Sequence, residues 1–203
     1  MRLVIPSMRQ TAAWLSLWNS DIAQEVIDRD PRLLMDAGDP ASLPLSVREQ
    51  VLRAVVAQVV DDEEFDIPNR NSLKRFAKPE MAPCLRDLWE SHARSPAVRE
   101  LLLLMIQLGE LVSCADLAVV TSFGAHSDRY SQIFSGRALM AVAPDAEKRR
   151  YADYVRDNAG SVLNVLVWDA LDALFPAVLS IDDFLLILRS VDVSNRSGGV
   201  DLV

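Results

Sequence analysis

Apolar residues in the second half of the chain recur at helical spacing, in runs that short polar breaks separate. Three polar residues each open a new apolar run, at spacings of 32 and 35 residues: Ser113, Asp145 and Ser180. A second, mostly apolar run precedes each of them, and these runs are Val98–Leu108, Ile133–Ala143 and Val162–Phe175. A period in the low thirties with two helices per unit is typical of stacked α-helical repeats. The pattern therefore predicts an array of helix pairs, an architecture that usually serves recognition.

The clearest amphipathic helix of the chain is expected to begin with Ser46 as its N-terminal cap. Its apolar residues fall on one side at spacings of three and four: Val47, Val51, Leu52, Val55, Val56 and Val59. Valine generally favours strands, but this spacing favours a helix. On the polar side Glu49 precedes Arg53 by four residues, which is the favourable order for an exposed ion pair.

The same periodicity predicts helices along the rest of the chain, and no segment shows a strand pattern. In the first half the predicted helices run from about Ser7 to Trp18, over Asp21–Asp30, and from Pro31 to Gly38. In the second half they cover Pro83–Ala93, Pro96–Leu108 (ended by Gly109), and about 114–124, 128–142, 146–158, 162–175 and 181–190. Ser113 and Ser180 each precede an aspartate by three residues, which predicts two capping boxes with Asp in place of Glu.

A polar stretch in the middle of the chain is the best candidate for a domain boundary. It starts with Asp61-Asp62-Glu63-Glu64 and continues through Phe65–Ser72. We therefore predict a helical subdomain at 1–70, a repeat region at 71–193 and a tail at 194–203. The expected fold class is all-α: stacked antiparallel helix pairs, a HEAT-like α-solenoid, with an irregular N-terminal helical subdomain.

One short sequence match links the two predicted regions. The triplet Val-Arg-Glu occurs at Val47 and again at Val98, each time near the start of a helix that we expect to face inward. Chance alone can produce a three-residue match, and the match also agrees with the helix-pair pattern.

Composition and charge limit the classes of partner. The net charge of −8 argues against general affinity for nucleic acid or for anionic lipid, and the densest basic run, Lys148-Arg149-Arg150, reads as a solvated helix face. Cys84 and Cys114 stand beside hydrophobic positions and are expected to be buried and reduced. The longest apolar runs reach about a dozen residues, short of a bilayer span, and no secretory signal is visible. We expect a soluble, cytoplasmic protein.

Motifs for catalysis and for cofactor binding are missing from the sequence. The seven glycines are scattered, so neither a phosphate-binding loop nor a dinucleotide fingerprint is present. The cysteines and histidines (Cys84, His92, Cys114 and His126) do not have the spacing of a compact zinc motif. A local cluster around Gly124 contains Ser122, His126, Ser127 and Asp128, of which Ser127 or Asp128 is more simply the cap of the next helix. We predict no catalytic, cofactor-binding or metal-binding residues.

Two features are candidates for a partner surface. Trp14 and Trp18 are four residues apart and are expected to share one helix face, whereas Trp168, inside an apolar helix, is expected in the core. Packing is the simplest role for all four tryptophans, and an interface role fits the Trp14 and Trp18 pair best. The acidic cluster Asp61, Asp62, Glu63 and Glu64 ends a helix where negative charge is mildly unfavourable, which suggests a solvated loop or a basic partner.

Several segments look like parts of a known family. They are Ile5–Leu15, Arg29–Leu34, Gly38–Ala41, Leu111–Ala118 and Gly136–Leu139. Together they resemble the helical region that follows the ATPase module of large bacterial STAND (NACHT-type) NTPases. In that family this region acts as a sensor or scaffold, and several members take part in defence against phage. The ATPase module has no counterpart here, so ATP hydrolysis is not implied for any residue, and we expect a fragment, a split-gene product or an excised domain.

The expected function is a non-catalytic scaffold or sensor segment for protein recognition, within a larger STAND-like assembly. Its partner would be another protein or the remainder of a longer chain. One alternative is a small α-helical enzyme whose site is assembled from distant residues. Another is a stand-alone adaptor that forms homo-oligomers through its repeat ends, because the apolar run Phe184–Leu188 looks uncapped.

Overall fold

The protein is all-helical in the residues that the computed structural model describes, which are 5–61, 68–124 and 128–191. These ranges contain twelve α-helices and four short 3₁₀-helices and no strand. The all-α prediction is therefore confirmed. The chain divides into two compact units, residues 1–142 and 143–203. The boundary predicted between residues 70 and 71 falls within a helix, and the predicted tail at 194–203 lies outside the described residues.

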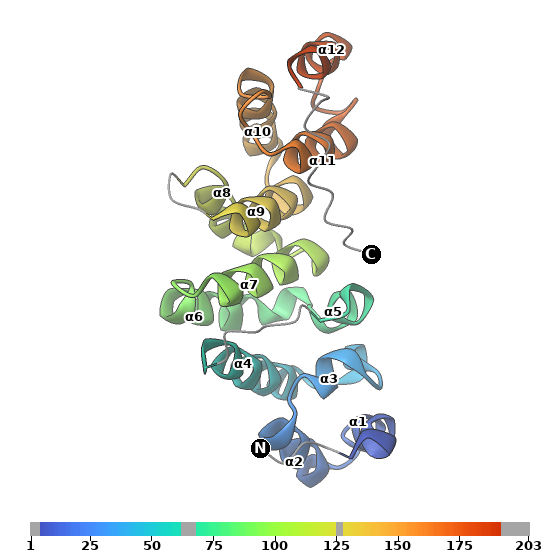
Figure 1. Cartoon of the computed structure of the whole chain (residues 1–203). Helices are drawn as coiled ribbons and strands as arrows, with labels where there is room; N and C mark the ends of the chain where they lie inside the picture. Colours follow the sequence, from blue (N-terminus) through green and yellow to red (C-terminus); the bar gives the residue numbers. More distant parts are fainter. Residues whose placement is uncertain (1–4, 62–67, 125–127, 192–203) are drawn as a thin grey trace. The chain divides into compact units, whose positions relative to one another are not determined.

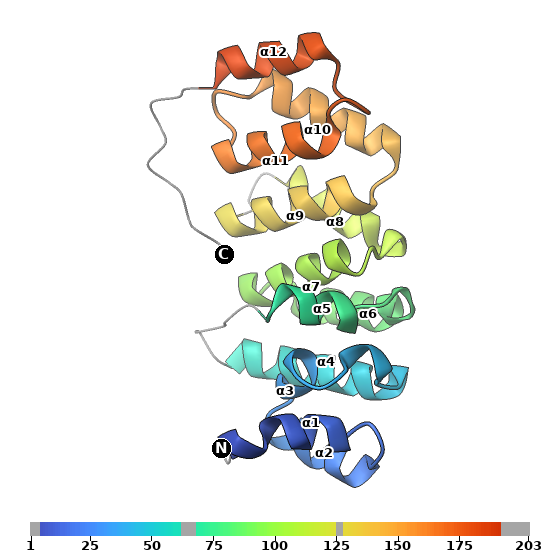
Figure 2. The same ribbon diagram turned by 90° about the vertical axis from the view of Figure 1, so that its right-hand side faces the viewer.

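The first unit is built from successive layers of helices (Figures 1 and 2). Its α-helices are α1 (Arg9–Leu15), α2 (Ser20–Arg29), α3 (Leu33–Asp36), α4 (Leu45–Asp61), α5 (Arg70–Phe76), α6 (Ala82–His92), α7 (Pro96–Leu108), α8 (Ala115–Ser122) and α9 (Arg129–Val142). Its 3₁₀-helices are η1 (Pro6–Met8), η2 (Pro40–Ser42), η3 (Pro79–Met81) and η4 (Val112–Cys114). Contacts lead from α1 to α2, from α2 to α4, from α4 to α6 and α7, and from α7 to α9.

Helix α7 forms the centre of this unit. Every residue from Leu101 to Ile106 is buried, because α4, α5, α6, α8 and α9 all contact this helix. A helix that is apolar all round requires such a surrounding. The apolar face predicted for α4 is confirmed from Val51 onward, since Val51, Leu52, Val55, Val56 and Val59 are buried and Arg53 is exposed; Val47 is only partly buried.

The helix ends agree only in part with the sequence. The capping box of Ser180 and Asp183 is confirmed. The box predicted at Ser113 is wrong, because Ser113 lies inside η4 and α8 begins at Ala115 without a side-chain cap. Ser46 does not cap α4 either, since that helix begins at Leu45.

The predicted ion pair between Glu49 and Arg53 is replaced by a contact between two helices. Arg53 donates from Nη2 to Asp87 Oδ2 of α6 at 2.9 Å. The favourable spacing within one helix therefore did not decide the partner, because a carboxylate of the neighbouring helix lies within reach.

Helix α5 lies where the sequence indicated a polar break. Asn69 caps it by accepting hydrogen bonds from the backbone nitrogens of Asn71 and Ser72, at 3.0 and 3.2 Å. Leu73 and Phe76, three residues apart, are fully buried. Two apolar side chains at helical spacing after a capping residue are thus enough to fix a helix of two turns, once α3 and α7 cover them.

Two glycines end helices for different reasons. Gly38, which follows α3, has φ of +68°, a conformation that residues with a Cβ seldom adopt. Gly109, at the end of α7, has an ordinary φ of −86°, and the positive φ belongs to Glu110. A Cβ on Gly109 would lie only 2.8 Å from the Cβ of Ala77, so a glycine is needed here for the close approach of α5 and α7.

The second unit contains α10 (Asp145–Asp157), α11 (Asn164–Leu174) and α12 (Ile181–Ser190), and α10 contacts both of the others. Trp168 of α11 was predicted in the core, and this is wrong: its side chain is 52% exposed. The buried stripe of α11 runs through Leu166, Val167, Ala170, Leu171 and Leu174, and position 168 falls outside it. No helix in the described parts of the chain is long and apolar enough to cross a membrane.

Candidate functional site

Part of the candidate partner surface lies at the end of the first unit. Trp14 and Trp18 are 45% and 75% exposed, and their rings stack with centroids 6.4 Å apart and an interplanar angle of 17°. Asp61 is the last residue of α4, while Asp62, Glu63 and Glu64 lie outside the described residues. The two tryptophans therefore do share one exposed face.

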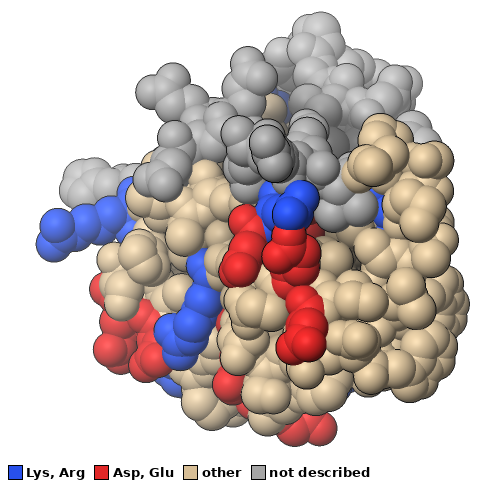
Figure 3. Space-filling model, turned by 90° about the horizontal axis from the view of Figure 1, so that it is seen from below, with Lys and Arg blue, Asp and Glu red and all other residues tan. Residues whose placement is uncertain are grey.

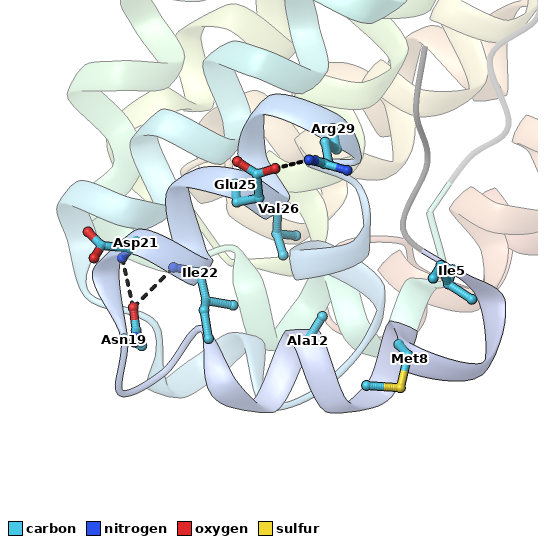
Figure 4. Close-up of a pocket in the computed structure, with 9 residues that line it drawn as sticks. All are labelled: Ile5, Met8, Ala12, Asn19, Asp21, Ile22, Glu25, Val26 and Arg29. Atoms are coloured by element: carbon cyan, nitrogen blue, oxygen red, sulfur yellow. Dashed lines mark hydrogen bonds and ion pairs between the residues drawn. The ribbon is translucent and has the colours of Figure 1, made fainter.

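A groove of about 560 Å³ lies between the segment that contains η1 and α1, on one side, and α2, on the other. Its apolar lining consists of Ile5, Met8, Ala12, Ile22 and Val26. Its polar lining consists of Asn19, Asp21, Glu25 and Arg29. In Figure 4, Ile22 and Val26 point from α2 toward α1, and Ala12 points back from α1 near Val26.

Simple local features build this groove. Asn19 begins α2 by accepting hydrogen bonds from the backbone nitrogens of Asp21 and Ile22, at 2.9 and 3.1 Å. Ile22 and Val26 are four residues apart and so lie above one another on one helix face. Ala12 opposes them with a single methyl group, which leaves the space that a larger side chain would fill.

The rim of the groove carries excess negative charge. The basic residues of α1 and α2 are Arg9 and Arg29; Arg9 pairs with the nearly buried Asp30, and Arg29 pairs with Glu25. Asp21 has no ion pair among the described residues, and Asp28 accepts a hydrogen bond from the uncharged Gln24 at 2.8 Å. Figure 3 views this end from below and shows acidic side chains in its middle, with basic side chains next to them and uncharged surface on the right.

The sequence did not reveal the groove, although it assigned the lining residues other than Ile5 and Asn19 to helices. Ile22 and Val26 carry the signal of a core-facing stripe, and Ile5 and Met8 are exposed, at 66% and 51%. The groove and the tryptophans are separate surfaces, because Trp14 lies roughly 200° around α1 from Ala12 at about 100° per residue. The segment from Ile5 to Arg29 has more apolar residues than its helices can bury against each other, and this excess could have indicated a binding surface.

Arginines connect consecutive layers of helices. Arg48 donates to the carbonyl oxygen of Leu43 at 2.8 Å and to that of Phe76, 28 residues ahead, at 3.4 Å. Arg99 donates to the carbonyl oxygen of Ala93 at 2.9 Å and to Asp128, 29 residues ahead, at 2.5 Å. The two arginines of the repeated Val-Arg-Glu triplet thus make equivalent contacts: one to the preceding turn and one to the next layer.

Two further arginines follow the same rule. Arg86 donates to Asp116, 30 residues ahead, at 3.0 and 2.5 Å, and this pairing holds the pKa of Asp116 below its usual value. Arg156, in the second unit, donates to Asp183, 27 residues ahead, at 3.1 Å. These four separations, 27 to 30 residues, are somewhat shorter than the spacings of 32 and 35 residues in the sequence pattern.

Charges around Arg99 shift two carboxyl groups in opposite directions. Burial alone would raise the pKa of Asp128, but hydrogen bonds from Ser131 and Arg99 outweigh it and lower that pKa. Burial, together with repulsion from Asp128, raises the pKa of Glu100 to about 7, against the attraction of Arg99. The carboxyl group of Glu100, which is partly exposed on α7, should therefore change its charge near neutral pH.

Within the described residues, no group of three or more His, Cys, Asp or Glu side chains could hold a metal. Cys84 and Cys114 are free and buried, as predicted, and burial raises the pKa of both thiols, which disfavours the reactive thiolate. Asp128 caps α9 by accepting from the backbone nitrogen of Ser131 at 2.9 Å, whereas His126 and Ser127 lie outside the described residues.

Comparison with known proteins gives no relative. No protein-family model matches the chain, and no curated protein and no solved structure matches it either. The family resemblance of the quoted segments therefore stays a prediction, and the geometry of the chain itself has to support any function.

Proposed function

We propose that the chain is a non-catalytic scaffold or sensor segment that recognises protein, built as a HEAT-like α-solenoid. Its proposed setting is a larger STAND-like assembly, with defence against phage as the biological role. The setting rests on the resemblance of segments such as Ile5–Leu15 and Leu111–Ala118 to the helical region of that family. The recognition role has independent support in the geometry.

The observation that carries the proposal is the recurrence of the arginine contacts. In a helical repeat each unit contacts its neighbours, so equivalent side chains should bind groups one repeat ahead. Arg48 of α4 and Arg99 of α7, in matching Val-Arg-Glu triplets, bind groups 28 and 29 residues ahead, and Arg86 of α6 binds Asp116, 30 residues ahead. Other arginines of this unit also connect separate helices, at separations of 34 residues for Arg53 and Asp87 and 37 for Arg70 and Gln107. Repeated contacts between helices about thirty residues apart support the proposal, although their separations are not uniform.

The lining of the α1–α2 groove also favours a binding role over catalysis. The α1–α2 groove is lined by apolar side chains with carboxylates at its rim, which suits a docking segment of another protein. An enzyme site needs a nucleophile, a base or a metal whose groups converge. The described residues bring no such set together around the groove.

Hydrogen exchange measured by mass spectrometry on a variant tests the repeat architecture. Val26 is buried in α2, so Val26→Ala weakens the first helix pair. In a repeat array the effect reaches nearest neighbours only. We expect faster exchange in peptides from α1 to α4 and unchanged exchange in α8 and α9. Equal acceleration in all peptides of the first unit would contradict a repeat array.

Light scattering coupled to size-exclusion chromatography separates the scaffold from the self-associating adaptor. A recognition module is expected to have a molar mass near 22.5 kDa at all concentrations. A mass that rises with concentration would favour the homo-oligomer, in which apolar side chains of α12 such as Leu185 and Leu186 pair between copies.

A further inference from the structure

We propose that the α1–α2 groove binds one amphipathic helix of a protein partner, with the apolar face of that helix inside the groove and lysine or arginine residues at its edges. This rests on the proposed recognition function and adds to it the surface and the chemistry of the partner. Three properties of the groove lead to this conclusion: its dimensions, its apolar lining and the charge of its rim.

The dimensions fit a short helix. The residues of α2 that line the groove run from Asp21 to Arg29, which corresponds to about 12 Å at about 1.5 Å per residue. A docked helix covers the same length with anchor residues at i, i+3 or i+4, and i+7. The volume of about 560 Å³ accommodates a few large aliphatic side chains.

The lining is apolar and adaptable. Ile5 and Met8 expose most of their side chains on one edge, and Ile22 lines the opposite wall. Exposed apolar surface of this kind, next to a polar rim, marks binding sites on proteins. Methionine adjusts its shape easily, which suits a surface that receives side chains of another protein.

The charge of the rim selects the partner. The charged residues of the groove lining are Asp21, Glu25 and Arg29. Asp28 lies outside the lining and continues the acidic stripe of Asp21 and Glu25 along α2, at i+7 from Asp21. Only Glu25 of this stripe has an arginine partner among the described residues, namely Arg29. A helix that enters the groove therefore gains when its flanking residues are basic and loses when they are acidic.

The same charge argues against two other occupants. A membrane surface is anionic, and an acidic stripe repels it. Within the chain, the basic run Lys148-Arg149-Arg150 lies on α10, but the apolar face of α10 is already buried through Tyr151, Ala152 and Val155. The exposed apolar helix α12 begins with Asp182 and Asp183, which is the wrong charge. We therefore assign the groove to a different protein.

The test uses the full chain and a fluorescent synthetic peptide of about 18 residues that carries leucine at i, i+3, i+4 and i+7 with flanking lysines. A second peptide has glutamate in place of each lysine, and a third has the leucines in scrambled order. Fluorescence anisotropy is expected to show saturable binding of the lysine peptide alone, with affinity that falls as NaCl rises from about 50 to 500 mM. Equal binding of the glutamate peptide, or no binding of the lysine peptide at about 1 mM, would overturn the proposal.

Matched variants locate the binding. Met8→Glu is expected to weaken the lysine peptide at least about tenfold, while Val120→Glu, at another exposed apolar position, leaves it unchanged. Asp21→Asn with Asp28→Asn is expected to weaken it about tenfold, while Glu80→Gln with Asp172→Asn, at exposed acids elsewhere, does not. Equal loss in the control variants would overturn the assignment to the groove. Circular dichroism shows whether each variant is folded, and the paired aspartate variant decides the question if Met8→Glu does not fold.

Vesicles provide the remaining comparison. Binding of the protein to phosphatidylcholine vesicles with about 30% phosphatidylserine, together with failure of the lysine peptide, would favour a membrane and contradict a protein partner. Failure of all peptides together with the local hydrogen-exchange response of Val26→Ala would remove the groove proposal and leave the repeat scaffold intact. Global acceleration of exchange in that variant would remove the scaffold instead.

Discussion

Two regions of the first unit, helix α7 and the α1–α2 pair, are both rich in apolar residues, yet they differ in what covers them. In α7 the side chains from Leu101 to Ile106 are all buried, because helices pack on every side. In α1 and α2 the buried apolar residues are Ala13, Ala23, Val26 and Ile27. The larger apolar side chains Met8, Trp14, Leu15 and Trp18 remain exposed.

This difference separates stability from recognition. Burial of apolar area stabilises the folded state, so the interior of the unit around α7 should contribute most of the free energy of unfolding. Exposed apolar side chains contribute little to folding and are available for a partner. The α1–α2 pair, which has an open groove and an acidic rim, is the region that we expect to bind.

Truncation of one leucine in each region should give the largest difference in the free energy of unfolding. Leu102 of α7 is fully buried, so Leu102→Ala should lower the free energy of unfolding by about 2–5 kcal/mol. The matched change Leu15→Ala, in exposed α1, should cost less than about 1 kcal/mol. Urea denaturation followed by circular dichroism measures both, and equal costs would break the contrast.

A methyl group at the end of α7 should have the next largest effect. Gly109→Ala places a Cβ 2.8 Å from that of Ala77, so we expect a loss of about 1–3 kcal/mol from overpacking. Gly160→Ala is the control, because its Cβ would meet only the carbonyl oxygen of Ser190, at an ordinary 3.5 Å. Thermal melting of both variants checks this, and a stable Gly109→Ala protein would show that the contact between α5 and α7 is looser than the structure indicates.

Removal of an arginine that connects two layers of helices should lower the stability somewhat less than Gly109→Ala does. Arg99→Met leaves Asp128, Ser131 and the carbonyl oxygen of Ala93 without this donor, and we expect a loss of about 1–2 kcal/mol. Arg94→Met, at an exposed position, should change the stability by less than about 0.5 kcal/mol. The pKa of Asp128, measured by nuclear magnetic resonance, should rise in the Arg99 variant alone.

The smallest predicted effect depends on pH. Because the folded state raises the pKa of Glu100 from 4.5 to about 7, it binds the proton more tightly than the unfolded state does. Wild-type stability should therefore fall between about pH 4.5 and 7 through this group. Glu100→Gln removes the charge, so it should match the wild type near pH 4.5 and gain about 1 kcal/mol at pH 8, after allowance for solvent screening. An equal difference at both pH values would contradict the assignment.

Helix boundaries were predictable where prolines, glycines and caps mark them. The predicted helix Pro96–Leu108 matches α7, and Pro83–Ala93 differs from α6 by one residue at each end. Proline at a first helical position and a close approach at Gly109 act locally, so the sequence alone is sufficient. Helix α5 was missed because its helical signal consists of Leu73 and Phe76 alone within a polar stretch.

Burial and binding surfaces were harder to predict, because they depend on which elements pack together. Trp168 sits in an apolar helix, yet the stripe that α10 covers does not include it. Ile22 and Val26 have the spacing of a core stripe; Val26 is buried, Ile22 is only partly buried, and both also line the groove. The exposure of Trp14 and Trp18 agrees with the candidate partner surface, whereas their role in binding stays a prediction.

The central claim is that α7 holds the unit together and the α1–α2 pair is a separable, low-stability surface. Native-state hydrogen exchange of the wild-type chain, at increasing urea below the unfolding transition, tests it most directly. We predict that amides of α7 exchange only with unfolding of the whole unit, and that amides of α1 and α2 open with a free energy at least about 2 kcal/mol lower. Exchange of all three helices with one common free energy would contradict it.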